Sequence, residues 1–410
     1  MEVTDARWKY WRSYYPVLEG LFYVFQGLYL TALSVYQSVF MTKVWALPYT
    51  TIAMLSSVLM IPGYLKSFTG LLSDRVPWGR FGRRRPYILI GAIAYLPCFV
   101  LLASIKEFGL PWMAMIILAT WVWVLVDGTL DALTVDVTPP EKMGLMQGTA
   151  WGCRGIGAAI GSVMITQVGL KYGWATGIYL IGGLASLMAV SGLFMREPPV
   201  RKEVLPGIRD FKETFSKRRT WVGFAYTILY FASNGMMMIF APFMLRNVGI
   251  SVADLGIVMA AVQIGNFIGC MVVGRASDAF GAKKIGYGIS VVFWCGLALW
   301  MTLSSGASWT WILAVSAVYG FVSGGLTVPM LRIIMELSPP TLGGFMFATY
   351  ASAANFGAAT VGALTIGHFV PMLGLPMAIF TLIPYTIVGC ILLPFTEPWA
   401  PSKGSSEEPP

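Results

Sequence analysis

Long apolar stretches, separated by short polar segments, run through the whole chain. A helix rises about 1.5 Å per residue, so about 20 apolar residues cross the hydrocarbon core of a bilayer, which is about 30 Å thick. Twelve stretches meet this length. The expected spans are 16–42, 48–72, 86–105, 111–137, 145–168 and 174–195, followed by 220–245, 252–274, 285–304, 308–335, 343–369 and 374–395. The pattern therefore predicts an all-α membrane protein with twelve transmembrane helices in two groups of six.

A polar segment at 196–219 separates the two groups of spans. It holds eight lysines and arginines and three prolines, and we expect one short amphipathic helix in it, around Ile208 to Phe215. The domains that we expect are an N-terminal six-helix bundle (1–195), a cytoplasmic linker (196–219), a C-terminal six-helix bundle (220–395) and a disordered cytoplasmic tail (396–410).

The composition agrees with a membrane protein. Of the 410 residues, 57% are hydrophobic and only 11% are charged, whereas a soluble domain carries about 25% charged residues. The single histidine and the five scattered cysteines form no metal-binding or disulfide pattern, so we expect no metal and no cofactor. The sequence also offers no nucleophile–base pair and no phosphate-binding glycine loop, so we do not expect an enzyme.

Lysine and arginine residues are distributed unevenly between the two sides of the predicted membrane. The segments on the side of the N-terminus hold 21 of them, and the loops on the opposite side hold only 4. Under the positive-inside rule, this bias places both termini in the cytoplasm of a multi-pass protein of the cell membrane. The net charge of +9 is therefore read as a signal of membrane orientation and lipid contact, and we expect no nucleic-acid partner.

The two groups of spans repeat one another. Segment 136–140 (DVTPP) recurs as 336–340 (ELSPP), and segment 70–74 (GLLSD) recurs as 274–278 (GRASD). A Phe-Met pair ends both the first and the seventh spans, at Phe40 and Phe243. These three offsets of 200–204 residues predict two parallel six-helix repeats. This architecture is typical of alternating-access carriers, whose substrate site lies between the halves.

The loop between the second and third spans carries a glycine- and arginine-rich motif. Residues 70–86 read GLLSDRVPWGRFGRRRP. The motif resembles the signature loop of the major facilitator superfamily, in which Gly-x3-Asp-Arg is followed by Gly-Arg-Arg or Gly-Arg-Lys. The resemblance implies the major facilitator fold.

We expect this loop to form an inner gate, because its arginines can clasp acids at the ends of neighbouring helices. The expected gating residues are Gly70, Asp74, Arg75, Gly79, Arg80, Arg83, Arg84, Asp136, Asp278 and Glu336. The alternative is that the basic residues anchor anionic lipid.

Two shorter segments resemble particular branches of that superfamily. Residues 80–88 (RFGRRRPYI) resemble the sucrose and glycoside–cation symporters. Residues 127–144 resemble the muropeptide permeases and their acetyl-CoA and folate–biopterin carrier relatives. Both resemblances imply a polar organic solute, and sugar character is the theme that they share.

Several charged residues fall inside the predicted spans, where a charge costs about 2.5–3.5 kcal/mol and is a functional candidate by default. Asp127 and Asp131 are spaced i, i+4 and share one helix face. Two carboxylates so close together should not both ionise easily, so we expect one of them to carry a proton and to couple transport to a proton gradient. Arg154 is the counter-ion that we expect for the pair, and Glu19 is either a second proton site or a group near the interface.

Other charges and the coupling ion leave alternatives open. We expect Lys66 to extend its ammonium group toward the interface. Arg332 either pairs with Glu336, one turn away, or faces the substrate. Sodium, held by the two carboxylates, is the rival to the proton as coupling ion.

Aromatic and amide side chains are frequent deep in several spans, and rings combined with amides are suited to binding a sugar or another amphipathic solute. Some of these aromatic residues would instead form the belts at the membrane interfaces. The residues expected to bind substrate are Gln26, Tyr29, Tyr230, Asn234, Gln263, Asn266, Arg332 and Asn355.

The sequence thus favours a monomeric secondary active transporter, a proton symporter for a small polar organic solute with sugar character, with lipid as its other partner. A carrier for an organic anion or acylated cofactor, with Arg154 and Arg332 as anion clamps, is the first alternative. The second alternative is a non-transporting assembly factor of the same fold, which would not need a titratable pair in its core.

Overall fold

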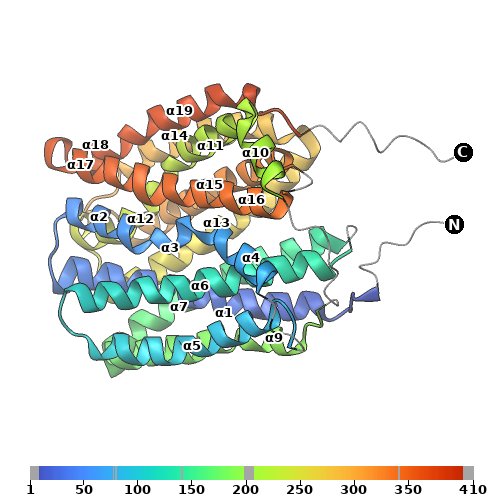
Figure 1. Ribbon diagram of the computed structural model, residues 1–410. Helices are drawn as coiled ribbons and strands as arrows, with labels where there is room; N and C mark the ends of the chain where they lie inside the picture. Colours follow the sequence, from blue (N-terminus) through green and yellow to red (C-terminus); the bar gives the residue numbers. More distant parts are fainter. Residues whose placement is uncertain are drawn as a thin grey trace, which may run out of the picture.

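A computed structural model describes residues 9–76, 78, 81–139, 142–197, 207–339 and 342–399. Throughout these ranges the regular structure is helical, and the helices lie side by side in two bundles (Figure 1). Both ends of the described chain lie at one end of the molecule, which we call the inner end; the opposite end is the outer end. The disordered tail was expected to begin at residue 396, but residues 396–399 are held on the second bundle: Lys283 donates to the carbonyl oxygen of Thr396 at 2.6 Å, and the backbone N–H of Trp399 donates to the carbonyl oxygen of Glu336 at 2.8 Å. The rest of the expected tail, from residue 400, lies outside the described residues.

The first bundle contains the N-terminal repeat. Its elements are α1 (Tyr15–Val39), η2 (Phe40–Val44), α2 (Tyr49–Leu59), α3 (Ile61–Tyr64), α4 (Lys66–Arg75), α5 (Arg85–Ser104), α6 (Leu110–Val137), α7 (Met143–Tyr172), α8 (Trp174–Ser186) and α9 (Ala189–Phe194).

The second bundle contains the C-terminal repeat, preceded by the linker helix α10 (Ile208–Ser216). Its elements are α11 (Arg218–Ala232), η5 (Ser233–Gly235), α12 (Met236–Phe243), η6 (Met244–Val248), α13 (Val252–Phe280), α14 (Ala282–Trp300), α15 (Trp309–Glu336), α16 (Gly343–Phe356), η7 (Gly357–Gly362), α17 (Ala363–Leu373), α18 (Leu375–Ala378), η8 (Ile379–Leu382), α19 (Ile383–Leu392) and η9 (Leu393–Phe395).

Eleven helical segments in the described ranges are long and apolar enough to cross a membrane. The one remaining expected span, the second in chain order, is interrupted. The second span was expected to be one helix over 48–72, but the structure divides it into α2, α3 and α4. The chain leaves helical geometry at Met60 and Leu65, and Pro62 occupies the start of the short α3, where no amide hydrogen is needed. The second break makes Lys66 the first residue of α4, in the interior of the protein.

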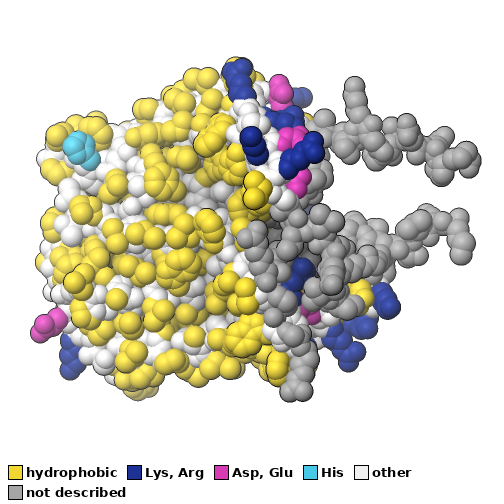
Figure 2. Space-filling model, viewed as in Figure 1, with side chains coloured by type: hydrophobic (Ala, Val, Ile, Leu, Met, Phe, Trp, Pro, Cys, Tyr) yellow, Lys and Arg dark blue, Asp and Glu magenta, His cyan; other side chains and the backbone are white. Residues whose placement is uncertain are grey.

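The side of the protein is covered by apolar side chains over most of its length, while charged side chains gather toward the inner end (Figure 2). Large apolar side chains such as Ile93, Ile156 and Ile264 are more than half exposed. A soluble protein rarely exposes such a broad apolar surface, whereas a bilayer covers it. The arrangement fits a multi-pass membrane protein.

Glycines let specific helices cross closely in both bundles. A Cβ atom on Gly27 would collide with the carbonyl oxygen of Arg154, so α1 and α7 are in backbone contact. In the second bundle, Gly265 meets the carbonyl of Ala317 in the same way, which brings α13 against α15. Such close crossings replace the hydrophobic effect as the source of helix association in lipid.

The predicted amphipathic linker helix is confirmed as α10. Its aromatic side chains pack on the C-terminal bundle, with Phe211 5.1 Å from Phe345 and Phe215 6.3 Å from Phe224, measured between ring centroids. The linker helix is therefore fixed to the second bundle.

Candidate functional site

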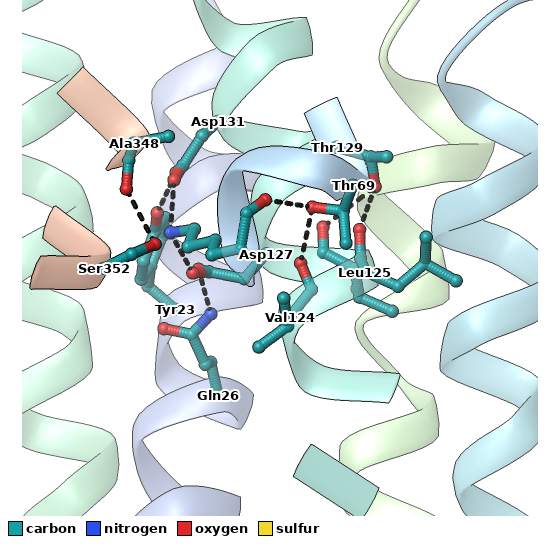
Figure 3. Close-up of polar contacts among 12 residues, drawn as sticks. Tyr23, Gln26, Thr69, Val124, Leu125, Asp127, Thr129, Asp131, Ala348 and Ser352 are labelled. Atoms are coloured by element: carbon teal, nitrogen blue, oxygen red, sulfur yellow. Dashed lines mark hydrogen bonds and ion pairs between the residues drawn. The ribbon is translucent and has the colours of Figure 1, made fainter. Parts of the chain in front are cut away.

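An ion-pair network joins α4 and α6 in the interior of the N-terminal bundle (Figure 3). The ammonium nitrogen of Lys66 lies 2.5 Å from Oδ2 of Asp127 and 2.9 Å from Oδ2 of Asp131. Both acids project from the same face of α6, because they are one helical turn apart. One cation therefore bridges the two carboxylates.

Helix α1 satisfies the remaining oxygen of each carboxylate. The amide of Gln26 donates to Oδ1 of Asp127 at 2.5 Å, and the hydroxyl of Tyr23 donates to Oδ1 of Asp131 at 2.6 Å. Asp127 is only 3% exposed, whereas the side chain of Asp131 keeps 39% of its surface accessible. Since Asp131 is six residues from the inner end of α6, it lies about 9 Å from that end, and Asp127 lies about 15 Å from it.

Glu19 is a third buried acid near this network, and it has a different environment. It is 1% exposed, and its Oε2 accepts a hydrogen bond of 2.8 Å from the hydroxyl of Thr134. Among the described residues no cation lies within 4 Å of it. The structure thus places Glu19 inside the bundle and not at the interface.

The cation of the network is Lys66, which corrects two expectations. Arg154 was expected to be the counter-ion of the two aspartates, but it forms no ion pair within the described ranges, and its guanidinium lies 5.1 Å from the centre of the Trp151 ring. Lys66 was expected to reach the interface, but the break before α4 turns it toward α6 instead. A buried carboxylate pair needs a cation close by, and α4 supplies it.

Arg332 of α15 belongs to an ion-pair cluster near the inner end of the second bundle. Its guanidinium lies 2.7 Å from Asp278 and 3.4 Å from Glu336, and it also donates to the carbonyl oxygen of Ser277 at 3.0 Å. Of the two roles considered for Arg332, the structure shows the pairing with Glu336 and adds Asp278. Two nitrogens of the guanidinium are held by residues of the same bundle near the inner end, so the contact expected between Arg332 and a substrate stays a prediction.

The equivalent motif of the first bundle holds the start of α5. The carboxylate of Glu197 accepts the backbone N–H groups of Arg83 at 2.9 Å and Arg84 at 2.7 Å. Arg85 in turn donates to the carbonyl oxygens of Gly192 at 2.8 Å and Leu193 at 2.9 Å, at the end of α9. The two helix ends therefore cap one another with opposite charges.

Part of this motif cannot be placed. Gly79 and Arg80 lie outside the described residues. The backbones of Gly70, Asp74 and Arg75 belong to α4, and that of Asp136 belongs to α6. Their side-chain contacts are outside what the structure describes, so the pairing expected between Asp136 and the loop stays a prediction.

Apart from Arg332, the predicted substrate residues fall into three groups: two buried tyrosines, three half-buried amides and two buried amides. Tyr29 and Tyr230 are fully buried inside their own bundles, and their hydroxyls donate to the carbonyl oxygens of Ala119 at 3.1 Å and Gly286 at 3.2 Å. The half-buried amides Gln263, Asn266 and Asn355 lie on α13 and α16, the helices that meet the first bundle.

The two buried amides, Gln26 and Asn234, each use only part of their hydrogen-bonding capacity. Gln26 has one buried oxygen, Oε1, without a hydrogen-bond partner in the described structure. Asn234 lies in the η5 break; its Oδ1 accepts from Ser323 at 2.6 Å, and its Nδ2 is buried without a described partner. Polar atoms left unsatisfied in the interior are candidates for binding a solute.

The two bundles are fastened together at the outer end. Tyr49 of α2 donates to the side chain of Asn247 at 2.6 Å, and Arg246 lies over the Tyr49 ring and donates to the carbonyl of Thr42 at 3.1 Å. We call these four residues the outer latch. Ser57 contacts Thr360, and Gly367 packs on Ala53, deeper in the same interface. The interface is therefore closed at the outer end, while Asp131 is accessible nearer the inner end.

Sequence reasoning missed Tyr23, Thr134 and the outer latch. Lys66 offered a signal that was available: a lysine inside an apolar span pairs with an acid more often than it faces lipid. Tyr23 and Thr134 offered no such signal, because hydroxyls are common in transmembrane helices.

A family model described as Major Facilitator Superfamily matches residues 19–234 and 222–410. Among curated proteins, a 3-(3-hydroxy-phenyl)propionate transporter of Escherichia coli is 27% identical over 284 residues, which is 66% of this chain. An MFS-type transporter, pynF, of Aspergillus niger is 25% identical over 203 residues, which is 47% of this chain. The chain spans 65% of the length of the first relative and 45% of the length of the second.

Solved structures share the fold at low sequence identity. A mutant of the nucleoside transporter NupG superimposes with a TM-score of 0.71 at 13% identity, covering 93% of this chain and 98% of that protein. A bacterial homolog of the human lysosomal transporter Spinster, in an inward-facing and occupied conformation, gives a TM-score of 0.68 at 15% identity, covering 95% and 99%. At these identities the likeness concerns the fold alone.

Proposed function

The chain belongs to the Major Facilitator Superfamily, and from this premise we propose that it is a proton-coupled symporter that moves a polar organic solute by alternating access. As a member of this family it is a membrane transporter and not an enzyme. The observation that supports proton coupling is a set of three carboxylates served by one lysine: Glu19 and Asp127 are buried, and Asp131 is partly exposed.

The charge balance of this set favours exchange of a proton. Lys66 neutralises one negative charge, so two ionised aspartates and an ionised Glu19 would leave an excess of two negative charges in a low-dielectric interior. Asp131 is the member of the set that water reaches, since its side chain is 39% exposed. A proton entering through Asp131 would reduce the excess, and Tyr23 or Lys66 would then change partners.

The network is also placed so that its charge can affect the contact between the bundles. Lys66 is the first residue of α4, and both α3 and α4 contact α16 of the second bundle. Figure 3 shows Ala348 and Ser352 of α16 beside the network. A change in how strongly Lys66 is held by α6 would therefore shift α4 against α16. That is the coupling of ion binding to a two-state motion that symport requires.

Proton coupling is favoured over sodium coupling by the position of Lys66. A sodium ion held by Asp127 and Asp131 would have to occupy the space between their oxygens. The lysine ammonium group occupies that space, at 2.5 and 2.9 Å.

Two substrate classes remain candidates for the transporter. The loop and α6 segments resemble carriers of sugars and related polar solutes. The Escherichia coli relative, in contrast, is named for a hydroxyphenylpropionate, which is an aromatic carboxylate. We further propose a monomer in the cell membrane with both termini in the cytoplasm, on the strength of the lysine and arginine distribution.

Transport in proteoliposomes under an imposed inward pH gradient tests the proposal. The probes are sucrose, gluconate and 3-phenylpropanoate, and we expect at least one to accumulate against its gradient. Asp131→Asn and Glu19→Gln should abolish accumulation while exchange of the same solute across the membrane continues. Glu213→Gln, on the exposed surface of α10, is the matched control and should accumulate solute normally.

The opposite results would reject the proposal. Solute accumulation that does not depend on the pH gradient and is unchanged by both carboxylate substitutions would exclude proton coupling. A folded protein that moves none of the probes, and whose cellular role survives Asp131→Asn, would favour the assembly-factor alternative.

A further inference from the structure

Arg154 is a charged residue that the proposed coupling network does not use. It lies near the middle of α7, a helix of 30 residues, and is half buried. The described residues offer it no carboxylate within 4 Å. A guanidinium group inside a membrane bundle is costly, and Arg154 has the Trp151 ring beside it but no acid of the described residues in direct contact, so it can accept an anionic ligand.

The contacts of α7 show which way Arg154 faces. One face, with Gly157 and Gly161, packs on α1, and a second face, with Gly152 and Gly155, packs on Phe267 of α13. Between these two faces the helix has one side that carries Ile156 and Ile160, both more than half exposed, as expected against lipid.

The remaining side of α7 carries Trp151, Arg154 and Ala158, at a spacing of three and four residues. This side is turned away from Ile156 and Ile160, and nearer the outer end it continues as Ile165 and Gly169, which pack on α8. Arg154 is near enough to act electrostatically both on Asp127 in the first bundle and on Cys270 in the second. The guanidinium thus lies where the two bundles face one another.

Helix α13 presents two amides to the same region. Gln263, Asn266 and Cys270 are spaced three and four residues apart and share one helix face. Gly155, the neighbour of Arg154, lies level with Gln263: a Cβ on this glycine would be 3.9 Å from the Gln263 carbonyl oxygen. Both amides are half buried, and neither the amide nitrogens nor the Gln263 oxygen has a hydrogen-bond partner among the described residues.

We propose that Arg154, with Gln263 and Asn266, forms a carboxylate-binding site between α7 and α13, so that the transported solute is an organic acid. The inference rests on the proposed transport function and names its substrate class. Arginine binds a carboxylate with two parallel hydrogen bonds, and the amides supply further donors for the same group. The Trp151 ring, which is 37% exposed, provides an apolar wall beside the guanidinium for the body of the solute.

The site also explains how an anion can bind near Asp127. Lys66 already neutralises one aspartate, and Arg154 supplies the positive charge that a solute carboxylate requires. A neutral sugar would offer hydroxyl acceptors to Arg154 but no negative charge to balance the guanidinium, which disfavours that class.

The test is a thermal-shift titration of the purified full-length protein with matched solute pairs. The pairs are 3-phenylpropanoate with 3-phenylpropanamide, benzoate with benzamide, and gluconate with gluconamide. At least one carboxylate should raise the melting temperature of the wild type, and its amide should not. Arg154→Gln should raise the apparent Kd of that carboxylate about tenfold or more, because it removes a charge-assisted pair.

Conservative variants keep the test decisive if Arg154→Gln does not fold. Arg154→Lys should bind the carboxylate more weakly than the wild type but better than any neutral variant, and Gln263→Ala should raise the apparent Kd by a smaller factor. Arg209→Gln, exposed on α10, is the matched arginine control and should bind like the wild type.

Three results would overturn the inference: equal binding of carboxylate and amide, unchanged carboxylate affinity in the Arg154 and Gln263 variants, or binding of no carboxylate by the wild type. Gradient-driven accumulation is measured separately. If a neutral solute accumulates under a pH gradient in both the wild type and Arg154→Gln, this inference fails and proton coupling stands. If carboxylate binding depends on Arg154 but no gradient drives uptake, coupling fails and the site stands.

Discussion

The two bundles share a scaffold but differ in their chemistry. The repeat offsets relate Lys66 to Cys270 (204 residues), Asp131 to Leu331 (200 residues) and Tyr23 to Tyr226 (203 residues). The first bundle therefore contains a lysine, an acid and a tyrosine in hydrogen-bonded contact, where the second has a thiol, a leucine and a tyrosine. In the second bundle, charge is concentrated at the inner end, on Arg332 and its two acids.

The tyrosine pair shows what this difference means physically. Tyr23 donates its hydroxyl to Asp131, but the hydroxyl of Tyr226 is buried and has no partner in the described part of the chain. The same residue type is retained for packing in both bundles, and it gains a polar role only where an acid faces it. We infer that ion coupling belongs to the first bundle, and that the second bundle contributes packing, a gate and amides for the solute.

The largest expected effect comes from removing the shared cation. Lys66→Met would leave the buried Asp127 and the partly exposed Asp131 without a counter-ion and should destabilise the protein by about 3–5 kcal/mol. Its counterpart in the other bundle, Cys270→Ala, should cost about 1 kcal/mol or less. Thermal unfolding in detergent measures both. Equal losses of unfolding free energy from Lys66→Met and Cys270→Ala would show that the buried charge does not distinguish the two bundles.

The close helix crossings should respond alike in the two bundles, because they belong to the shared scaffold. Gly27→Val and Gly265→Val each place side-chain atoms against a backbone carbonyl that cannot move aside easily. Each substitution should cost about 2–3 kcal/mol in the same unfolding assay. If Gly265→Val cost much less stability than Gly27→Val, the close helix crossing would not contribute equally to the two bundles.

The tyrosine pair gives the sharpest comparison. Tyr23→Phe removes a hydrogen bond to a charged group and should cost about 1.5–3 kcal/mol. Tyr226→Phe removes a buried hydroxyl without a described partner and should be neutral or slightly stabilising. Unfolding free energies of the two variants check this, and a costly Tyr226→Phe would reveal a polar role in the second bundle.

The smallest effect is expected at the outer latch, where the bundles meet. Tyr49→Phe deletes the hydrogen bond to Asn247, and its net value of about 1 kcal/mol corresponds to about a fivefold shift toward opening at the outer end. Spin labels at the exposed positions Lys106 and Ser304 would report the shift as a longer distance population. An unchanged distance distribution would show that the latch does not hold the bundles together.

Much of this architecture could be predicted from the sequence. Hydropathy alone gave the helical class and the number of spans, because a bilayer imposes a minimum apolar length. The repeat followed from three matched segments, and the amphipathic helix α10 from its local pattern. The shared face of Asp127 and Asp131 followed from helix geometry, since an i, i+4 spacing fixes it.

The pairing of the charges could be predicted only in part. A lysine inside an apolar span indicates an acid partner, but the pattern does not show which acid, and it does not show the break at Leu65 after which Lys66 begins α4. Arg332 was ambiguous, because only the fold brings Asp278 beside it. The outer latch depends on how the two bundles dock, and no local pattern around Tyr49 or Arg246 encodes that contact.

The mutual capping of α5 and α9 has a consequence for dividing the protein into two pieces. Glu197 follows the last helix of the first bundle, yet its carboxylate holds the start of the third span. An N-terminal fragment that stops before this residue would lose the carboxylate that accepts the N–H groups of Arg83 and Arg84 at the start of α5. A split version expressed as two chains should therefore be cut after Glu197 and before α10, so that each fragment keeps the contacts that close its own bundle.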